Sequence, residues 1–229
     1  MKLIKWNDLP EHMRTVEVKY YYDILKKRQI SLFFKRLFDI LMAFLLILVL
    51  SPLMIFLALL IKFDSPGPIF YRQQRATQYG RVFRIYKFRT MINDADKCGT
   101  HVTLKDDRRI TDVGKRIRNL RLDEIPQLFN ILCGDMSFVG SRPEALKYVR
   151  SYTSEMVATH LLPAGVTSTA SIEFKDEAKI LGSAMDADQV YIEKILPEKM
   201  KYNLEELEHF SLFNDMKVLV RTFFVIIRG

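Results

Sequence analysis

The stretch Ile40–Ile61 reads ILMAFLLILVLSPLMIFLALLI and contains no charged residue. As one α-helix it would extend for roughly 33 Å at about 1.5 Å per residue, which is enough to cross the hydrocarbon core of a bilayer. The rest of the 229-residue chain carries all 35 Lys and Arg side chains and all 27 Asp and Glu side chains. This uneven distribution disfavours an ordinary soluble globule and predicts a membrane-associated helix joined to a charged domain.

The charges on both sides of the apolar stretch bear on its orientation. Residues 1–39 hold nine Lys and Arg against five Asp and Glu, and residues 62–87 hold six against one. The positive-inside rule orients a spanning helix through a charge difference between its ends, and here both flanks are positive. At the centre, Pro52 removes a helical hydrogen bond and Ser51 can satisfy a freed carbonyl. Two interpretations stay open: half-helices that enter and leave by the same face, or a kinked helix that spans.

The patterns along the chain predict a mostly α fold with short β pieces (α+β). The residues after the apolar stretch are numerous enough for one compact domain, which we expect to be catalytic. Turn-forming residues at 64–68 mark where that domain begins. We expect three parts: a cytosolic extension at 1–34, a membrane segment at 35–64 and a domain at 65–229. Within the domain we expect extended pieces at 69–71 and 82–86, and helices at 112–122 and 122–132.

Two helical segments at the membrane allow alternative interpretations. Asp39 follows Arg36 by three residues and Lys35 by four, so on a helix it could pair with either, or stay solvated at the helix end. The segment Met216–Arg228 is apolar apart from Thr222 and three basic residues that lie within about 40° of one another on a helical wheel. Those basic residues are Lys217, Arg221 and Arg228. This helix would either lie in the headgroup plane or pack on the domain as a core helix.

Composition excludes several other classes of protein. Only two cysteines occur, Cys98 and Cys133, without metal-binding spacing, so we expect two free thiols in a reducing compartment rather than a disulfide scaffold. The net charge of +8 is compatible with a nucleic-acid-binding module, but the positive residues cluster beside apolar segments and no recognised binding motif is present. We therefore do not expect nucleic acid as a partner.

The adjacent pair Asp123-Glu124 is the first candidate for chemistry. Pro126 is tolerated only in the first turn of a helix, so we predict Asp123 as the N-cap. Free N–H groups and the helix dipole at that place keep a carboxylate ionised and favour a phosphate nearby. Mg²⁺ is commonly bound by one or two carboxylates together with substrate phosphate oxygens, and Asp123 could then attack phosphorus. Taken alone, such a pair is more often a helix cap with a solvated neighbour than a catalytic pair.

Cationic residues elsewhere in the chain favour the chemical interpretation. Lys87 and Arg89 lie two residues apart on an extended piece, and Arg142 follows in the glycine-bounded loop Gly134–Glu144. Arginine is suited to bidentate recognition of phosphate. Together with the acidic pair and the membrane segment, these cations predict a site for a doubly charged phosphate ligand at the membrane interface.

With these residues the chain resembles the bacterial sugar transferases, the monotopic phosphoglycosyl transferases, in their small form. The resemblance runs in order from about Lys35 to Thr222. The motifs that carry it are Lys35–Asp39, Ser51-Pro52, Asp64–Phe70, Arg72-Gln73, Tyr86–Met91, Leu122–Leu132 and Gly134–Gly140.

The resemblance implies transfer of a sugar 1-phosphate from a UDP-sugar to undecaprenyl phosphate, with release of UMP, as the first membrane step of a surface glycan. It implies a monotopic protein at the cytoplasmic face of the bacterial inner membrane, with a re-entrant helix broken at Ser51-Pro52. Asp123 would be the nucleophile that forms a covalent phosphosugar intermediate, and Glu124 would support it and, with it, a Mg²⁺ ion. The residues implied in contacts to the substrate are Lys87, Arg89, Arg142 and Glu144, and those implied in the membrane segment are Arg36, Asp39, Ser51 and Pro52.

The chain departs from the family pattern in two places. Ser141 replaces a proline before Arg142, and Leu162–Ser171 lacks an Arg, a Gly and a Gln, so its sugar or nucleotide contacts are not carried over. The segments Asp188–Tyr191 and Ser211–Lys217 resemble later motifs without an assigned step. The sugar, the glycan pathway and the oligomeric state, with a homodimer as one option, stay open. The alternative function is a non-catalytic scaffold of a glycan-assembly complex.

Overall fold

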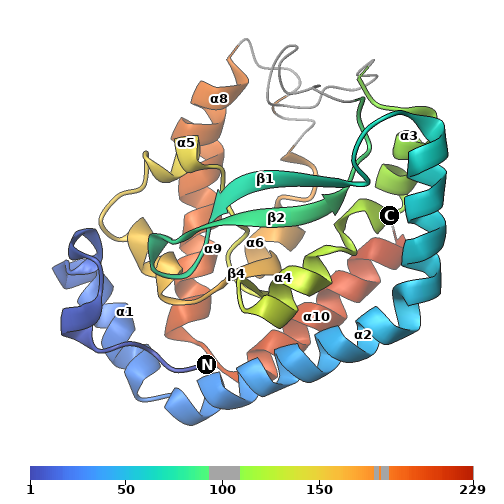
Figure 1. Cartoon of the computed structure of the whole chain (residues 1–229). Coiled ribbons are helices and arrows are strands. Elements are labelled where there is room, and N and C mark those ends of the chain that lie inside the picture. Colours follow the sequence, from blue (N-terminus) through green and yellow to red (C-terminus); the bar gives the residue numbers. More distant parts are fainter. Residues whose placement is uncertain (93–108, 178–180, 182–185, 229) are drawn as a thin grey trace.

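The computed structural model describes residues 1–92, 109–177, 181 and 186–228, which are mostly helical with a few short strands (Figure 1). This confirms the predicted mostly α class with short β pieces; Cys98 lies outside the described residues. The longer helices are α1 (Val16–Lys26), α2 (Gln29–Asp64), α3 (Asp112–Asn119), α4 (Gln127–Cys133), α9 (Leu196–Glu208) and α10 (Leu212–Arg228). The short helices are α5 (Leu146–Val149), α6 (Thr169–Glu173) and α8 (Ala187–Val190). The strands are β1 (Phe70–Ala76), β2 (Val82–Phe88), β3 (Met136–Val139) and β4 (Ala164–Thr167).

Helix α2 is 36 residues long and bends within its length, so that two limbs run in different directions around the domain (Figure 1). Pro52 lies inside the helix and has no N–H to donate to the carbonyl of Leu48. The hydroxyl of Ser51 donates to that same carbonyl at 2.8 Å. The predicted repair of a freed carbonyl by Ser51 is therefore confirmed, and Pro52 accounts for the bend.

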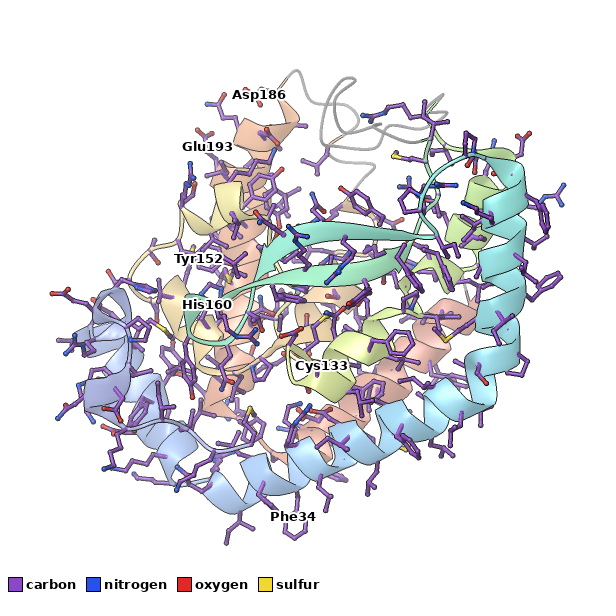
Figure 2. All side chains as sticks on the ribbon, in the orientation of Figure 1. Phe34, Cys133, Tyr152, His160, Asp186 and Glu193 are labelled. Atoms are coloured by element: carbon purple, nitrogen blue, oxygen red, sulfur yellow. The ribbon has the colours of Figure 1, made fainter. Side chains whose placement is uncertain are left out.

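Both limbs of α2 pack their inner side on the same domain. Ala43 of the first limb belongs to an apolar cluster with β2 and α4, and Leu57 and Ile61 of the second limb pack with Phe88 and Ile117. The outer side is apolar and exposed: Leu41, Phe44, Leu45, Leu48, Val49, Ile55, Phe56 and Leu59. Phe34, near the start of the helix, also points away from the domain (Figure 2). Within the described residues, α2 is the helix long and apolar enough to cross a membrane.

A buried ion pair ties the first limb of α2 to α10. The Nζ atom of Lys35 lies 2.6 Å from Oδ2 of Asp215 and donates to the carbonyl of Val139 at 2.8 Å. Helix α10 itself buries Val218 and leaves Phe213, Phe223 and Phe224 exposed. One side of α10 therefore packs on the domain, as expected for a core helix. The other side is apolar and exposed, so it is free to contact a membrane.

The partners of Asp39 differ from those that the sequence allowed. Its Oδ1 accepts from the hydroxyl of Ser137 at 3.1 Å and from the backbone N–H of Phe138 at 3.2 Å, and the side chain is buried. Arg36 instead donates to two carbonyls at the C-terminal end of α4. Asp39 is thus neither solvated nor hydrogen-bonded to Arg36 or Lys35, because β3, far away in the sequence, supplies its donors.

Strands β1 and β2 form an antiparallel hairpin, in agreement with the two predicted extended pieces, with Phe70 opposite Phe88. The side chain of Asn130 in α4 bonds to the backbone of β2, accepting from the N–H of Tyr86 at 2.8 Å and donating to the carbonyl of Arg84 at 3.1 Å. This contact fixes the hairpin on the helix that follows the acidic pair.

Strands β3 and β4 pair in parallel and come very close at two glycines. A Cβ atom on Gly165 would lie 2.2 Å from the backbone nitrogen of Gly140. Gly165 is the glycine that the departing Leu162–Ser171 region retains. Its place in the sheet is explained by backbone packing alone.

Residues 1–34 pack against the domain rather than extending from it (Figure 1). A core cluster joins this segment to α9 and to the turn at Met156–Leu161. Its buried members are Leu3, Leu9, Met13, Val18, Tyr21, Tyr22, Leu25, Leu32, Ala158, Leu161, Leu162, Leu207 and Phe210. A boundary between residues 34 and 35 falls inside α2, which begins at Gln29.

Candidate active site

The acidic pair lies on a 3-10 turn, Leu122–Glu124, that immediately precedes α4. Helix α4 begins at Gln127, with Pro126 in the N-cap position, so the prediction of Asp123 as the N-cap is wrong. The reason lies in the backbone: Arg121 adopts a left-handed conformation with φ of 56°, which inserts a separate turn between α3 and α4. Both carboxylates are consequently presented at a turn, not at a helix end.

Two cations hold the Glu124 carboxylate. Its Oε1 lies 2.6 Å from Nζ of Lys87 in β2 and 3.6 Å from Nη2 of Arg142 in the loop after β3. Burial alone would raise the pKa of Glu124, but the two cations outweigh it and lower the pKa to about 2. Glu124 is therefore ionised and already neutralised by the protein.

Asp123 has different surroundings, although it is the neighbouring residue. Within the described part of the chain, no other side chain hydrogen-bonds or forms an ion pair with its carboxyl. Burial raises the pKa of Asp123 above its ordinary value, Lys87 opposes this, and the charge of Glu124 adds to the increase. Asp123 thus keeps its oxygen lone pairs available to a ligand or to an electrophile.

Lys87 and Arg89, which the sequence placed together, have separate roles in the structure. Arg89 is buried, and its guanidinium donates to the carbonyls of Ile61, Ser65 and Pro66 and to the hydroxyl of Ser65. These contacts close the C-terminal end of α2. The prediction that Arg89 contacts the substrate is not supported by this placement. Strand β2 ends at Phe88, so the alternation that would put both cations on one side stops before Arg89.

Glu144 lies behind the site. Its carboxylate is buried and accepts from the hydroxyl of Tyr191 at 2.6 Å, with Nζ of Lys199 at 3.4 Å. In this arrangement the Glu144 carboxylate has no face open to a substrate, so the predicted substrate contact is not supported. The side chain connects the Arg142 loop to the C-terminal helices instead.

The donor set fits a divalent cation completed by a substrate. Among the described residues, no group of three or more His, Cys, Asp or Glu side chains could hold a metal ion. Mg²⁺ needs only one or two carboxylates when phosphate oxygens supply further ligands. Asp123 offers its carboxylate, and both cation contacts of Glu124 fall on Oε1. Asp123 and Glu124 would therefore hold the ion that the resemblance implies.

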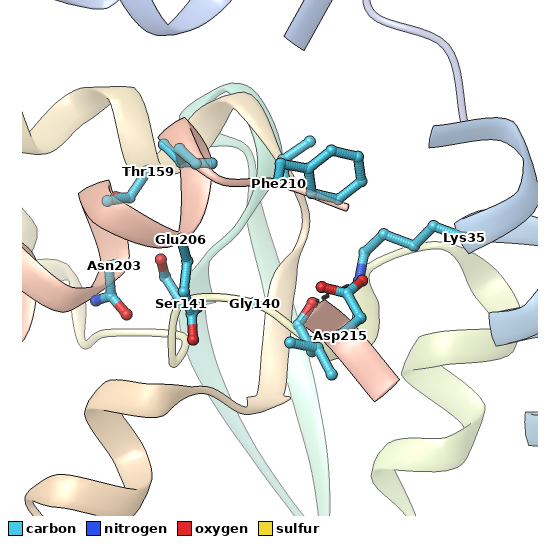
Figure 3. Close-up of a pocket in the computed structure, with 11 residues that line it drawn as sticks. Lys35, Gly140, Ser141, Thr159, Asn203, Glu206, Phe210 and Asp215 are labelled. Carbon is cyan, nitrogen blue, oxygen red and sulfur yellow. Dashed lines mark hydrogen bonds and ion pairs between the residues drawn. The ribbon is translucent and has the colours of Figure 1, made fainter. Parts of the chain in front are cut away.

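A polar cavity is enclosed by the segment Gly140-Ser141 and by helices α9 and α10 (Figure 3). Ser141, Asn203 and Glu206 line it, together with the Lys35–Asp215 pair. Within the described residues, the Oδ1 atom of Asn203 is the buried side-chain oxygen or nitrogen without a hydrogen-bond partner. A buried polar atom of this kind is normally satisfied by water.

Three polar side chains next to the site were absent from the predictions. Arg75 of β1 donates to the carbonyl of Pro143 at 3.4 Å, and Tyr191 and Lys199 contact Glu144. Tyr191 falls in the segment Asp188–Tyr191, which resembles a family motif without an assigned step. Lys199 gives no local signal, since a lysine on an amphipathic helix is usually solvated.

Residues 30–229 match the sequence model of a family described as bacterial sugar transferase. A UDP-N-acetylgalactosamine-undecaprenyl-phosphate N-acetylgalactosaminephosphotransferase of Aeromonas hydrophila is 38% identical over 200 residues, which cover 86% of this chain and 44% of the relative. A UDP-glucose:undecaprenyl-phosphate glucose-1-phosphate transferase of Escherichia coli K12 is 33% identical over 218 residues, 93% of this chain and 44% of the relative. An uncharacterized sugar transferase of Bacillus subtilis is 32% identical over 188 residues, 82% of this chain and 84% of the relative. The chain thus spans less than half the length of the first two.

Proposed function

The chain belongs to the bacterial sugar transferase family, and on this basis we propose that it transfers a sugar 1-phosphate from a UDP-sugar to undecaprenyl phosphate. In the first step, a carboxylate oxygen of Asp123 attacks the phosphorus that carries the sugar, and the bond to the bridging oxygen breaks to release UMP. In the second step, a phosphate oxygen of undecaprenyl phosphate attacks the same phosphorus and frees the carboxylate. The product is the lipid-linked diphosphosugar with which assembly of a surface glycan begins.

The observation that carries this proposal is the unequal environment of the two adjacent carboxylates. Glu124 is neutralised by Lys87 and Arg142, whereas no side chain of the described residues bonds to Asp123. A nucleophile must offer a lone pair, and Asp123 does so. The cations around Glu124 would stabilise the charge that develops on the departing phosphate. Asp123 and Glu124 would hold Mg²⁺, which when bound would screen the negative charge of the diphosphate.

We place the protein at the cytoplasmic face of the inner membrane, with α2 re-entrant. Two observations support this topology. Both limbs of α2 pack against the same domain, so both of its ends lie on the side of that domain. The outer side of the bend and of α10 is apolar and exposed, as a lipid-facing surface requires. The acidic pair would then meet soluble nucleotide sugar and lipid phosphate at the same interface.

The test is substitution of the proposed nucleophile in the purified full chain. Asp123→Asn keeps the shape of the side chain and removes the anionic oxygen, so we expect UMP release with undecaprenyl phosphate to fall by at least about 1,000-fold. A panel of UDP-sugars with a radiolabelled sugar phosphate would also identify the covalent adduct, which the variant should lack. EDTA is expected to stop the wild-type reaction and added Mg²⁺ to restore it.

Asp8→Asn is the matched control, because Asp8 is an exposed aspartate in the N-terminal segment. It should react at the wild-type rate. Wild-type turnover by Asp123→Asn would disprove the assigned nucleophile. A folded wild-type chain that releases no UMP from any UDP-sugar would favour the non-catalytic scaffold.

A further inference from the structure

The segment Arg142–Glu144 joins a partly exposed cation to a buried acid within three residues. The side chain of Arg142 is 39% exposed and faces Glu124, whereas that of Glu144 is 7% exposed. The backbone of the segment is held from β1: Ala76 donates its N–H to the carbonyl of Glu144 at 3.3 Å, and Arg75 donates to that of Pro143 at 3.4 Å. The position of Arg142 therefore depends on how well the two following residues are anchored.

The anchor of the side chain of Glu144 is a small network inside the protein. The hydroxyl of Tyr191 donates to its Oε1 at 2.6 Å, and Nζ of Lys199 lies 3.4 Å from the same atom. Lys199 also contacts the Tyr191 hydroxyl at 3.1 Å and Oε2 of Glu177 at 3.1 Å. Tyr191, Lys199 and Glu144 are all buried, so each polar group depends on the others for its hydrogen bonds.

The two donors come from one helical unit that contains a π turn at Tyr191–Ile195, between α8 and α9. In an uninterrupted α-helix, residues eight positions apart lie about 80° from each other. A π turn changes that phase, and here the side chains of Tyr191 and Lys199 converge on one carboxylate. The π turn thus brings both donors to Glu144.

We propose that Tyr191 and Lys199 are positioning residues for Arg142: they hold Glu144, and through it the segment that places the Arg142 guanidinium beside Glu124. The identity of the ligand rests on the proposed function, in which Arg142 binds the diphosphate of the UDP-sugar. The contact between Arg142 and Glu124 spans 3.6 Å and is not a tight pair, so the guanidinium stays available to a phosphate. Its direction is set by the anchored residues that follow it, and neither Tyr191 nor Lys199 touches the substrate.

Tyr191→Phe tests this relation with the smallest change. The substitution keeps the ring, which packs on Tyr148 with centroids 4.4 Å apart, and removes only the hydroxyl that donates to Glu144. With the full chain in detergent and UDP as the probe, we expect calorimetry to show binding about tenfold weaker than in the wild type. Tyr202→Phe is the matched control: Tyr202 lies in α9, half-buried, and its ring meets Phe174 edge-on. It should bind UDP like the wild type.

A cycle with Arg142→Ala separates positioning from a general loss of packing. If Tyr191 acts through Arg142, adding Tyr191→Phe to Arg142→Ala should weaken UDP binding by less than about twofold. Unfolding midpoints measured on the same variants would show any loss of stability. A loss of affinity that Tyr191→Phe causes through general packing would occur with and without Arg142, and the comparison of the two backgrounds reveals it.

Three outcomes would overturn the inference: wild-type affinity in Tyr191→Phe, additive losses in the double variant, or a wild-type chain that binds no UDP. The proposed function fails on a different result, since it is refuted when the wild type binds UDP but releases no UMP from any UDP-sugar. In that case the binding cycle still decides whether Tyr191 positions Arg142.

Discussion

Two lysine–carboxylate pairs in this protein have the same separation, but the pKa of the acid is shifted in opposite directions. In both the Lys87–Glu124 pair and the Lys35–Asp215 pair, the Nζ–O distance is 2.6 Å. The pKa of Glu124 is lowered to about 2. The pKa of Asp215 is raised, because burial outweighs the attraction of Lys35 and the charge of Asp39 adds to the increase.

The difference comes from what surrounds each pair. Glu124 meets a second cation, Arg142, whereas Asp215 meets a second carboxylate, Asp39. The distance within a pair therefore does not decide the state of the acid; the other charges around the pair do. We expect the Lys87–Glu124 pair to serve the reaction and the Lys35–Asp215 pair to serve the stability of the fold.

The largest effect on stability should come from removing Lys35. Lys35→Met leaves Asp215 and Asp39 buried without their nearest ammonium group, and breaking a buried pair from one side costs about 3 to 5 kcal/mol. Urea unfolding in detergent, followed by tryptophan fluorescence, measures this loss. Lys62→Met is the control on the same helix, since Lys62 is exposed, and it should change the free energy of unfolding by less than about 0.5 kcal/mol. Equal losses in the two variants would contradict the comparison.

Removing Lys87 should affect activity more than stability. Lys87→Met takes away one of the two cations beside Glu124, and we expect UMP release to fall on the order of 100-fold. The free energy of unfolding should fall by only about 1 kcal/mol, because the pair is partly exposed. Arg84→Met is the matched control, since Arg84 is an exposed cation on the same strand, and it should keep full activity. A loss of stability as large as in Lys35→Met would show that both pairs are structural.

The smallest of these effects should be a change in stability at acid pH. The pKa of Glu124 is about 2 in the folded protein and near 4.5 when unfolded, so its stabilisation is complete above pH 4.5 and is lost as the pH falls toward 2. Over this range of pH, we expect the free energy of unfolding of Glu124→Gln to fall by about 2 kcal/mol less than that of the wild type. Urea unfolding at pH 5 and pH 3 measures the difference. The same loss in both proteins would show that Glu124 is not held ionised by its cations.

Features that depend on neighbouring residues could be predicted from the sequence. The hydroxyl of Ser51 reaches the carbonyl of Leu48 within one helical turn, so the repair at Pro52 follows from spacing alone. The extended conformation of β1 and β2 likewise follows from short β-branched and aromatic runs, whereas their antiparallel pairing was not predicted. The N-cap prediction for Asp123 failed because nothing in the local residue types reveals that Arg121 takes a left-handed conformation.

Features that depend on distant partners could not be predicted. Asp39 finds its donors in β3, nearly one hundred residues later, and Arg89 bonds to the end of α2 instead of joining Lys87. In each case the residue type indicated a polar contact, and only the packing of distant elements selected the partner.

The sequence by itself determined an apolar helix with Ser51-Pro52 near its centre, a charged domain after it and an acidic pair with cations in the same chain, because composition and short-range spacing are local properties. Only the tertiary structure decided that Glu124 is the carboxylate neutralised by Lys87 and Arg142, that Asp123 is left unpaired by the described side chains, and that both limbs of α2 pack on one domain. The physical reason is that charge interactions and burial depend on distances in space, which residues far apart in the chain acquire only when it folds.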